Sequence, residues 1–184
     1  MAVQGEAANG QETLEKLSQG HYDVVLLDIS MPGRSGLEIL EEIVSHHPRL
    51  PVLILSMHPE EQYAVRALRA GAAGYLTKAS APQELIGAVR KVARGGKYVT
   101  ASLAEKLALE LDLGAQKQRH ETLSNREYQV MLMLAWGKSV GEIASELSLS
   151  VKTVSTYRSR VMEKMGMKKN AELTLYAENN HLLS

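Results

Sequence analysis

Two short runs of apolar residues constrain the fold of this chain most strongly. Val24–Leu27 (VVLL) and Val52–Leu55 (VLIL) are continuous rather than alternating, which is typical of strands buried on both faces of a parallel sheet. Each run is followed by apolar residues at helical spacing, over 35–47 and 59–71. Strands that alternate with helices predict βαβ units. The first half of the chain is therefore expected to be an α/β domain with a parallel sheet.

The same alternation extends in both directions. Further β-rich runs are AVQGEA (2–7) and GYLTK (74–78), and further helical patterns cover 10–19 and 81–96. Glycines stand where helices should end, at positions 20, 71 and 95. We therefore expect the α/β domain to occupy residues 1–96, with four strands and four helices.

Residues 97–121 connect this domain to the rest of the chain. KYVTASLAEKLALEL (97–111) predicts a short amphipathic helix, and the polar stretch GAQKQRHE (114–121) predicts a linker. From position 122 to the end at 184 the pattern is wholly helical. The sequence thus predicts an α/β domain, a connector and an all-α domain.

Composition excludes several classes of protein. The 184 residues contain no Cys, which excludes disulfides and thiolate metal sites. No apolar run approaches the roughly 18 residues of a membrane span, and the first ten residues lack the basic-then-apolar order of a signal peptide. A cytoplasmic location is expected.

A different polar side chain ends three successive strands. Asp28, Ser56 and Lys78 follow the expected strands, and the carboxyl ends of parallel strands meet at one rim of the sheet. A carboxylate there can attack a phosphoryl group, while an ammonium and a hydroxyl can hold the added oxygens. Taken singly, Asp28 could cap a turn, Ser56 could cap the next helix and Lys78 could be a solvated charge. Together they predict an aspartyl-phosphate site.

The stretches VVLLDISMPGRSGLEIL, PVLILSMH and GAAGYLTKAS resemble the receiver domain of bacterial two-component response regulators. The resemblance implies that Asp28 is the phosphoacceptor, phosphorylated by a sensor histidine kinase. It also implies that Ser56 is the switch hydroxyl, Lys78 the motif lysine and Tyr75 the switch aromatic, and that the main-chain carbonyl of Ser30 joins Asp28 in binding Mg²⁺.

One departure from the receiver pattern affects this site. Receivers begin with a strand that ends in two acidic residues, which bind Mg²⁺. This chain starts at what resembles the second strand, and neither Glu6 nor Glu12 takes the place of that pair. Mg²⁺ binding is therefore expected to be weak or lost. The AVQGEA strand would lack its lateral partner and is expected to be frayed, mispaired or exchanged between protomers.

The C-terminal helices carry clear boundary signals. Ser124 with Glu127, and Ser139 with Glu142, have the spacing of capping boxes. A third helix is expected to begin after Ser150 and to end at Gly166. The apolar residues of these helices are expected to share a core made of Val130, Leu132, Leu134, Ile143, Ala144, Leu147, Val154, Val161 and Met165.

The positive charge of the chain is concentrated in this second part. Through Gly114 there are 11 Lys/Arg against 14 Asp/Glu, and from Ala115 onward there are 10 against 7. Six lysines and arginines between 148 and 169 are opposed only by Glu163. Such a cluster indicates a polyanionic partner, with a solvated helix face as the alternative. Two short helices joined by a tight turn, the second one basic, predict a helix-turn-helix.

Residues 123–183 resemble the LuxR-type helix-turn-helix of the NarL/FixJ family, whose signature runs close to LSxRExxV…EIAxxLxLSxKTVxxxRxxxMxKMG. Tyr157 replaces the usual His. The resemblance implies double-stranded DNA as the partner, and dimerisation through the last helix, about 170–180. It implies base contacts from Ser155, Thr156 and Ser159. The flanking Lys152, Arg158 and Arg160 are expected to contact phosphates, and Thr153 is expected to belong to the same DNA-binding surface.

The sequence is thus identified as a member of the NarL/FixJ response regulators, a DNA-binding transcription regulator that is not an enzyme. Two alternatives stay open. One is a phosphorylation-independent DNA-binding regulator with a degenerate receiver, which the missing acidic pair favours. The other is a small phosphatase that uses Asp28, which the presence of Ser30, where a general acid is usual, disfavours.

Overall fold

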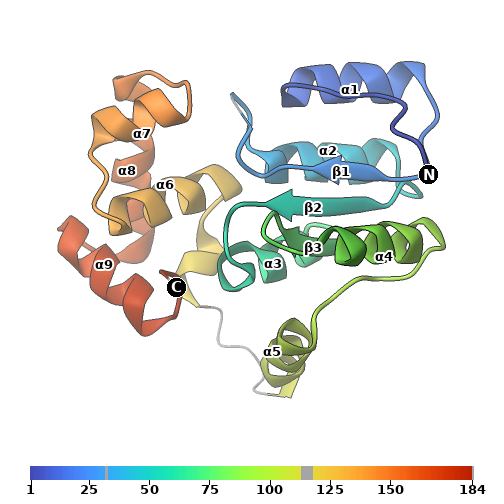
Figure 1. The fold of residues 1–184 in the computed structure, drawn as a ribbon. Helices are drawn as coiled ribbons and strands as arrows, with labels where there is room; N and C mark the ends of the chain where they lie inside the picture. Colours follow the sequence, from blue (N-terminus) through green and yellow to red (C-terminus); the bar gives the residue numbers. More distant parts are fainter. Residues whose placement is uncertain (32, 113–117, 184) are drawn as a thin grey trace. The chain divides into compact units, whose positions relative to one another are not determined.

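The computed structural model describes residues 1–31, 33–112 and 118–183 (Figure 1). The chain divides into two compact units, Met1–Leu107 and Ala108–Ser184. Half of the expected linker, residues 114–117, lies outside the described residues. Within the described residues, no helix is long and apolar enough to cross a bilayer.

The first unit contains a parallel sheet of three strands. Strands β1 (Val25–Leu27), β2 (Val52–Ser56) and β3 (Gly74–Thr77) lie side by side in that order. β1 pairs with β2, and β2 with β3, both in parallel. The sheet and its strand alternation confirm the predicted α/β class.

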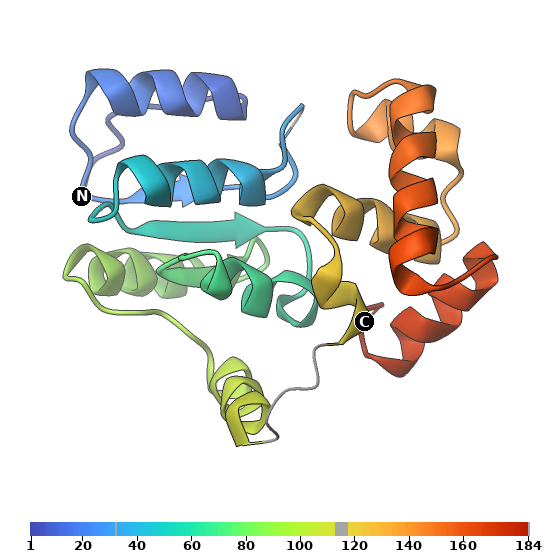
Figure 2. The ribbon, with the colours of Figure 1, turned by 180° about the vertical axis from the view of Figure 1, so that it is seen from behind.

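Helices cover both faces of this sheet (Figures 1 and 2). Helices α2 (Gly36–His46) and α3 (Glu60–Arg69) lie on one face, and α4 (Pro82–Ala93) lies on the other. Helix α1 (Gly10–Gln19) packs on α2. The first three helices of the unit, α1 to α3, begin and end within three residues of the ranges expected from apolar spacing.

AVQGEA forms no strand, so the expected fourth strand is wrong, whereas the expectation that this segment is frayed agrees with the structure. Residues 1–7 have no regular secondary structure, and the sheet ends at β1. Alternating polar and apolar residues give an extended segment no stability without a neighbour to pair with. Helix α4 packs on one face of β2 and β3. Leu26, in the middle of β1, lies on the same face of the sheet and is 48% exposed.

The segment after α4 returns to the sheet before it leaves the unit. Tyr98 forms a parallel bridge with Gly74 at the free side of β3, and the Tyr98 N–H donates to the carbonyl of Ala73 over 2.8 Å. A Cβ on Gly74 would lie 2.6 Å from the Tyr98 carbonyl oxygen, so only glycine allows this approach. Helix α5 (Ala101–Asp112) follows directly.

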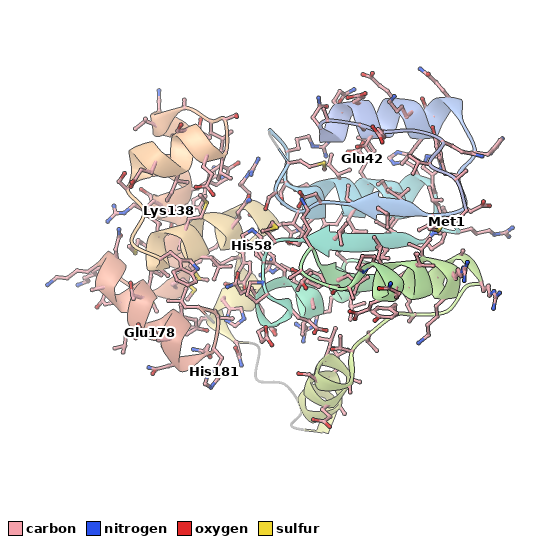
Figure 3. All side chains as sticks on the ribbon, viewed as in Figure 1. Met1, Glu42, His58, Lys138, Glu178 and His181 are labelled. Atoms are coloured by element: carbon pink, nitrogen blue, oxygen red, sulfur yellow. The ribbon has the colours of Figure 1, made fainter. Side chains whose placement is uncertain are left out.

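The second unit is helical. It contains the 3₁₀ turn η1 (Arg119–Thr122) and helices α6 (Asn125–Ala135), α7 (Val140–Glu146), α8 (Val151–Met165) and α9 (Asn170–Asn179). Figure 3 draws the side chains, with Lys138 labelled in the turn before α7, where it pairs with Glu146. All nine apolar residues that were predicted to share the core are buried.

The predicted helix boundaries of this unit are confirmed. Ser124 and Ser139 each close a capping box with the glutamate three residues on. The Ser150 hydroxyl accepts the N–H of Thr153, and Gly166 ends α8 in the left-handed conformation at φ 66°. These caps fix the lengths of α6, α7 and α8, and therefore the turn between α7 and α8.

Candidate phosphoacceptor site and nucleic-acid interface

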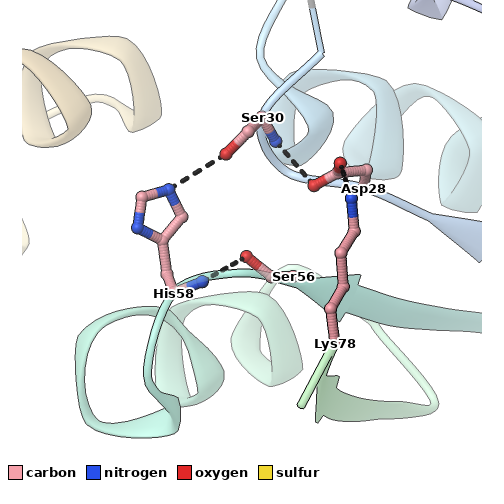
Figure 4. Close-up of polar contacts among 5 residues, drawn as sticks. All are labelled: Asp28, Ser30, Ser56, His58 and Lys78. Atoms are coloured by element: carbon pink, nitrogen blue, oxygen red, sulfur yellow. Dashed lines mark hydrogen bonds and ion pairs between the residues drawn. The ribbon is translucent and has the colours of Figure 1, made fainter.

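The three predicted strand-end residues come from the carboxyl ends of the three strands. Asp28 directly follows β1, Ser56 is the last residue of β2 and Lys78 follows β3. The parallel register brings these ends to one rim of the sheet (Figure 4). β2 and β3 are mostly buried scaffold, whereas β1 exposes Leu26, and the polar groups lie where the chain leaves the sheet.

The carboxylate of Asp28 is engaged at both oxygens. Lys78 Nζ lies 2.6 Å from Oδ2, and the N–H of Ser30 donates to Oδ1 over 2.9 Å. The Asp28 side chain is 27% exposed and that of Lys78 is 38% exposed. An incoming phosphoryl group can therefore reach a carboxylate that already has a cation beside it.

Ser56 is fully buried and holds the loop that follows β2. Its hydroxyl accepts the N–H of His58 over 3.1 Å. The carbonyl of His58 accepts the hydroxyl of Tyr75 over 2.8 Å. Burial raises the pKa of the Tyr75 hydroxyl, so this donor keeps its proton at neutral pH. Ser56 does not cap α3, whose N-cap is Pro59.

Sequence reasoning missed His58 as part of this rim. Its ring Nε2 lies 3.0 Å from the Ser30 hydroxyl, so the loops after β1 and β2 are joined across the site (Figure 4). The sequence shows a histidine two residues after the strand-end Ser56. It gives no sign that this histidine contacts Ser30, which lies 28 positions earlier in the chain.

The rim residues that are described do not fit a tightly held Mg²⁺. Asp28 is the one carboxylate that the prediction placed there, with the main-chain carbonyl of Ser30 as second ligand. Across residues 1–31, 33–112 and 118–183, no group of three or more His, Asp or Glu side chains could hold a metal ion. Mg²⁺ prefers six oxygen ligands in octahedral geometry, so two protein ligands hold it weakly.

Helix α8 has a buried apolar face, although Val151 at its first position is exposed. Val154, Val161 and Met165 are buried, at 0%, 0% and 1% exposure. The predicted DNA-contacting residues that are exposed all lie on this helix: Lys152, Ser155, Thr156, Ser159 and Arg160. Thr153 and Arg158 are half-buried. The exposed part of the helix thus carries hydroxyls flanked by the cations Lys152 and Arg160.

Three hydrogen bonds hold side chains of this surface in place. Arg158 Nε donates to Oδ1 of Asn170, the first residue of α9, over 3.0 Å, which uses one of its five N–H donors. The hydroxyls of Thr156 and Ser159 donate to carbonyls four residues earlier in α8, over 3.0 and 3.1 Å. These hydroxyls thus offer their lone pairs outward.

Comparison with known proteins agrees with this geometry. Residues 1–90 match the model of the response regulator receiver domain, and residues 121–177 match that of the bacterial regulatory proteins of the luxR family. Response regulator UvrY of Escherichia coli is 38% identical over 173 residues, which cover 94% of this chain and 79% of UvrY. Response regulator GacA of Pseudomonas viridiflava is 38% identical over 178 residues, or 96% of this chain and 83% of GacA.

Solved structures of RcsB from Salmonella enterica serovar Typhimurium have the same fold. RcsB bound to the promoter rprA, in the presence of the phosphomimetic BeF3−, matches with a TM-score of 0.59 and 25% identity, over 96% of this chain and 85% of that chain. A second RcsB structure matches with a TM-score of 0.63 and 26% identity, over 94% and 82%. This chain therefore belongs to the NarL/FixJ family, the DNA-binding transcriptional response regulators that join a receiver domain to a LuxR-type helix-turn-helix domain.

Proposed function

We propose that this regulator binds duplex DNA through α8 and that phosphorylation of Asp28 controls this binding. The observation that carries the DNA-binding role is the exposed hydroxyl and cationic face of α8, backed by a buried apolar face. Ser155, Thr156 and Ser159 would read base edges. Phosphate contacts would come from the residues around them: Lys152, Thr153, Arg158 and Arg160.

The control step is phosphoryl transfer from a sensor histidine kinase. An Asp28 oxygen attacks the phosphorus of the kinase phosphohistidine, the P–N bond breaks, and the imidazole nitrogen takes a proton. Lys78 would then pair with the new phosphoryl oxygens, and the Ser56 hydroxyl would bond one of them. Tyr75 is the aromatic that would respond. Receiver domains generally use Mg²⁺ for this step, and in this chain the ion would be weakly bound by Asp28 and Ser30.

The proposed function also assigns a role to each part of the chain and a dimeric state on DNA. Residues 1–96 form the receiver, 97–121 the connection and 122–184 the DNA-binding domain. We place the protein in the cytoplasm, where its DNA would be, and assign it no enzymatic role. One relative structure is described as two RcsB dimers bound to two parallel DNAs. By analogy, α9 would join two copies of this chain on DNA.

A second function has a specific observation in its favour. Because no group of three or more His, Asp or Glu among the described residues could hold a metal ion, the receiver would be degenerate and α8 would bind DNA whatever the state of Asp28. The two functions differ in one respect, because only the first requires Asp28 for regulation.

Salt-dependent binding of the full chain to duplex DNA tests the shared part of both functions. Lys152→Ala should weaken binding to every sequence and lower the slope of log affinity against log salt by about one unit. Arg94→Ala, which removes a charge from the end of α4, is the matched control and should leave the slope unchanged. DNA binding that does not respond to salt, or a loss with Arg94→Ala equal to that with Lys152→Ala, would refute the role of α8.

A further inference from the structure

The N-terminus of α5 is tied to the first residue of α3. The Thr100 hydroxyl accepts the N–H of Leu103 over 3.2 Å, and the Thr100 carbonyl accepts that of Ala104 over 3.0 Å, so Thr100 caps α5. The same hydroxyl donates to the carboxylate of Glu60, at 2.7 Å from Oε1 and 2.8 Å from Oε2. One hydroxyl thus joins two helices that begin about 40 positions apart.

Glu60 stands at the end of the loop that leaves the phosphoacceptor rim. The main chain of His58 is held on both sides, by Ser56 at its N–H and by Tyr75 at its carbonyl. Only Pro59 separates His58 from Glu60, and its ring fixes one of the two backbone dihedrals of that residue. A displacement of His58 therefore moves Glu60.

The other side of Thr100 is anchored to the sheet. Tyr98 is bonded to Ala73 and lies against Gly74 at the edge of β3. Thr100 follows two residues later, so its backbone cannot move far to follow Glu60. A shift of Glu60 consequently stretches the Glu60–Thr100 hydrogen bond. Helix α5, which this bond caps, is the element through which the chain passes from the first unit to the second at Leu107.

We propose that Glu60 and Thr100 relay the state of the Asp28 rim to α5. The relay rests on the proposed function, because it gives the route by which the receiver would act on the rest of the chain. When the Ser56 hydroxyl leaves His58 for a phosphoryl oxygen, Glu60 shifts and the cap of α5 loses its carboxylate partner. Both residues are positioning residues, since neither touches the phosphoryl group.

Hydrogen exchange of the full chain tests the cap itself. Thr100→Val keeps the shape of the side chain but removes the hydroxyl, and should speed exchange of the Leu103 amide about fivefold. Glu60→Ala should also speed exchange of the Leu103 amide severalfold. Thr100→Ser, which keeps the hydroxyl, should leave this exchange as slow as in the natural chain. Asn9→Ala, the matched control, removes the cap of α1, where Asn9 accepts the N–H of Glu12. It should speed exchange at Glu12 and leave Leu103 unchanged.

A second arm tests the relay. Tyr75→Phe removes only the hydroxyl that holds the His58 carbonyl. It should speed exchange at Leu103 about threefold in the natural chain and have no effect on Leu103 in the Thr100→Val background. An equal effect in both backgrounds, no effect in either, or unchanged exchange in Glu60→Ala would overturn the relay. These measurements need neither phosphorylation nor DNA, so the failure of the relay and the failure of the proposed function give different results.

Discussion

The ammonium of Lys78 lies 2.6 Å from Oδ2 of Asp28, although 50 positions separate the two residues in the chain. The contact forms because β1 and β3 flank β2 in parallel, so that the residues which follow them meet at one rim. The ion pair is partly exposed, and such pairs contribute only about 0–1 kcal/mol to stability. Its significance is chemical, since it places a cation where a phosphoryl group would add charge.

We expect the 184-residue chain to accept phosphoryl groups from acetyl phosphate very slowly or not at all. Phosphoryl transfer needs a cation that bridges the developing charge, and a loosely held Mg²⁺ does this poorly. Incorporation of labelled phosphate with and without Mg²⁺ measures the rate. Addition of an N-terminal strand that ends in two acidic residues should restore labelling.

Asp28→Asn in the chain with the added strand is the control for this prediction. The amide keeps the size of the side chain but is no nucleophile toward phosphorus, so labelling should disappear. Lys78→Met should lower labelling without preventing folding, because the ammonium is partly exposed. Rapid Mg²⁺-dependent labelling of the chain without the added strand would contradict the expected weakness of the metal site.

A pair of glycine substitutions tests how tightly the Asp28 backbone is held. A Cβ on Gly36 would lie 2.1 Å from the Asp28 carbonyl oxygen and 2.7 Å from the Ile29 Cα. Gly36→Ala should therefore lower the free energy of unfolding by roughly 3 kcal/mol in urea denaturation. Gly87→Ala in α4, where nothing lies within 4 Å, should instead raise it by about 0.5–1 kcal/mol. Equal stability of the two variants would show that Gly36 is not confined by the Asp28 loop.

Local signals explain why so much of the fold could be predicted. The capping boxes at Ser124 and Ser139 and the left-handed Gly166 are determined by residues within four positions of each other. The apolar faces of α7 and α8 follow from helical spacing, whereas every residue of α6 is buried, polar ones included, which spacing does not predict. The wrong strand at 2–7 has a different cause, because a strand depends on a neighbour that the segment itself does not specify.

In the candidate site, too, some features can be predicted from the sequence and others cannot. The position of Asp28 and Lys78 at the ends of parallel strands is enough to predict that they share one rim. The contacts between Ser30 and His58, and between Glu60 and Thr100, join side chains 28 and 40 positions apart. Such contacts depend on loop geometry and rotamers, which periodicity and residue type do not determine.

The hydroxyls of α8 lead to a prediction about base preference. Because Thr156 and Ser159 donate to their own helix, their lone pairs are available to accept from amino groups of adenine or cytosine in the major groove. Thr156→Ala should relax preference at one base pair by about 1 kcal/mol, and Thr156→Ser should retain it. Selection from a random pool of duplexes measures this. A uniform loss of affinity with unchanged preference would assign Thr156 to phosphate contact instead.

The ion pair between Glu127 and Lys164 gives a prediction about pH. Lys164 Nζ lies 2.6 Å from Oε2 of Glu127, whose side chain is 4% exposed, and the pair joins α6 to α8. Burial opposes ionisation of Glu127, but hydrogen bonds from Lys164 and the Ser124 N–H outweigh it and hold the pKa of the Glu127 carboxyl below its usual 4.5. The folded state thus favours the carboxylate. Its contribution to stability is present above about pH 4.5 and is lost as pH falls through the lower folded value.

Lys164→Gln should therefore lower the free energy of unfolding by about 1 kcal/mol at pH 7, since Lys164 is itself 41% exposed and solvent weakens the pair. The difference from the natural chain should shrink as pH falls from 6 to 3, because a protonated Glu127 no longer attracts the ammonium. Lys152→Gln removes the same charge from the other end of α8 and should show no such trend. Urea denaturation without DNA, at steps of half a pH unit, measures all three proteins. A Lys164→Gln difference that stays constant over this range would mean that the lysine stabilises the domain through packing of its aliphatic stem rather than through the carboxylate.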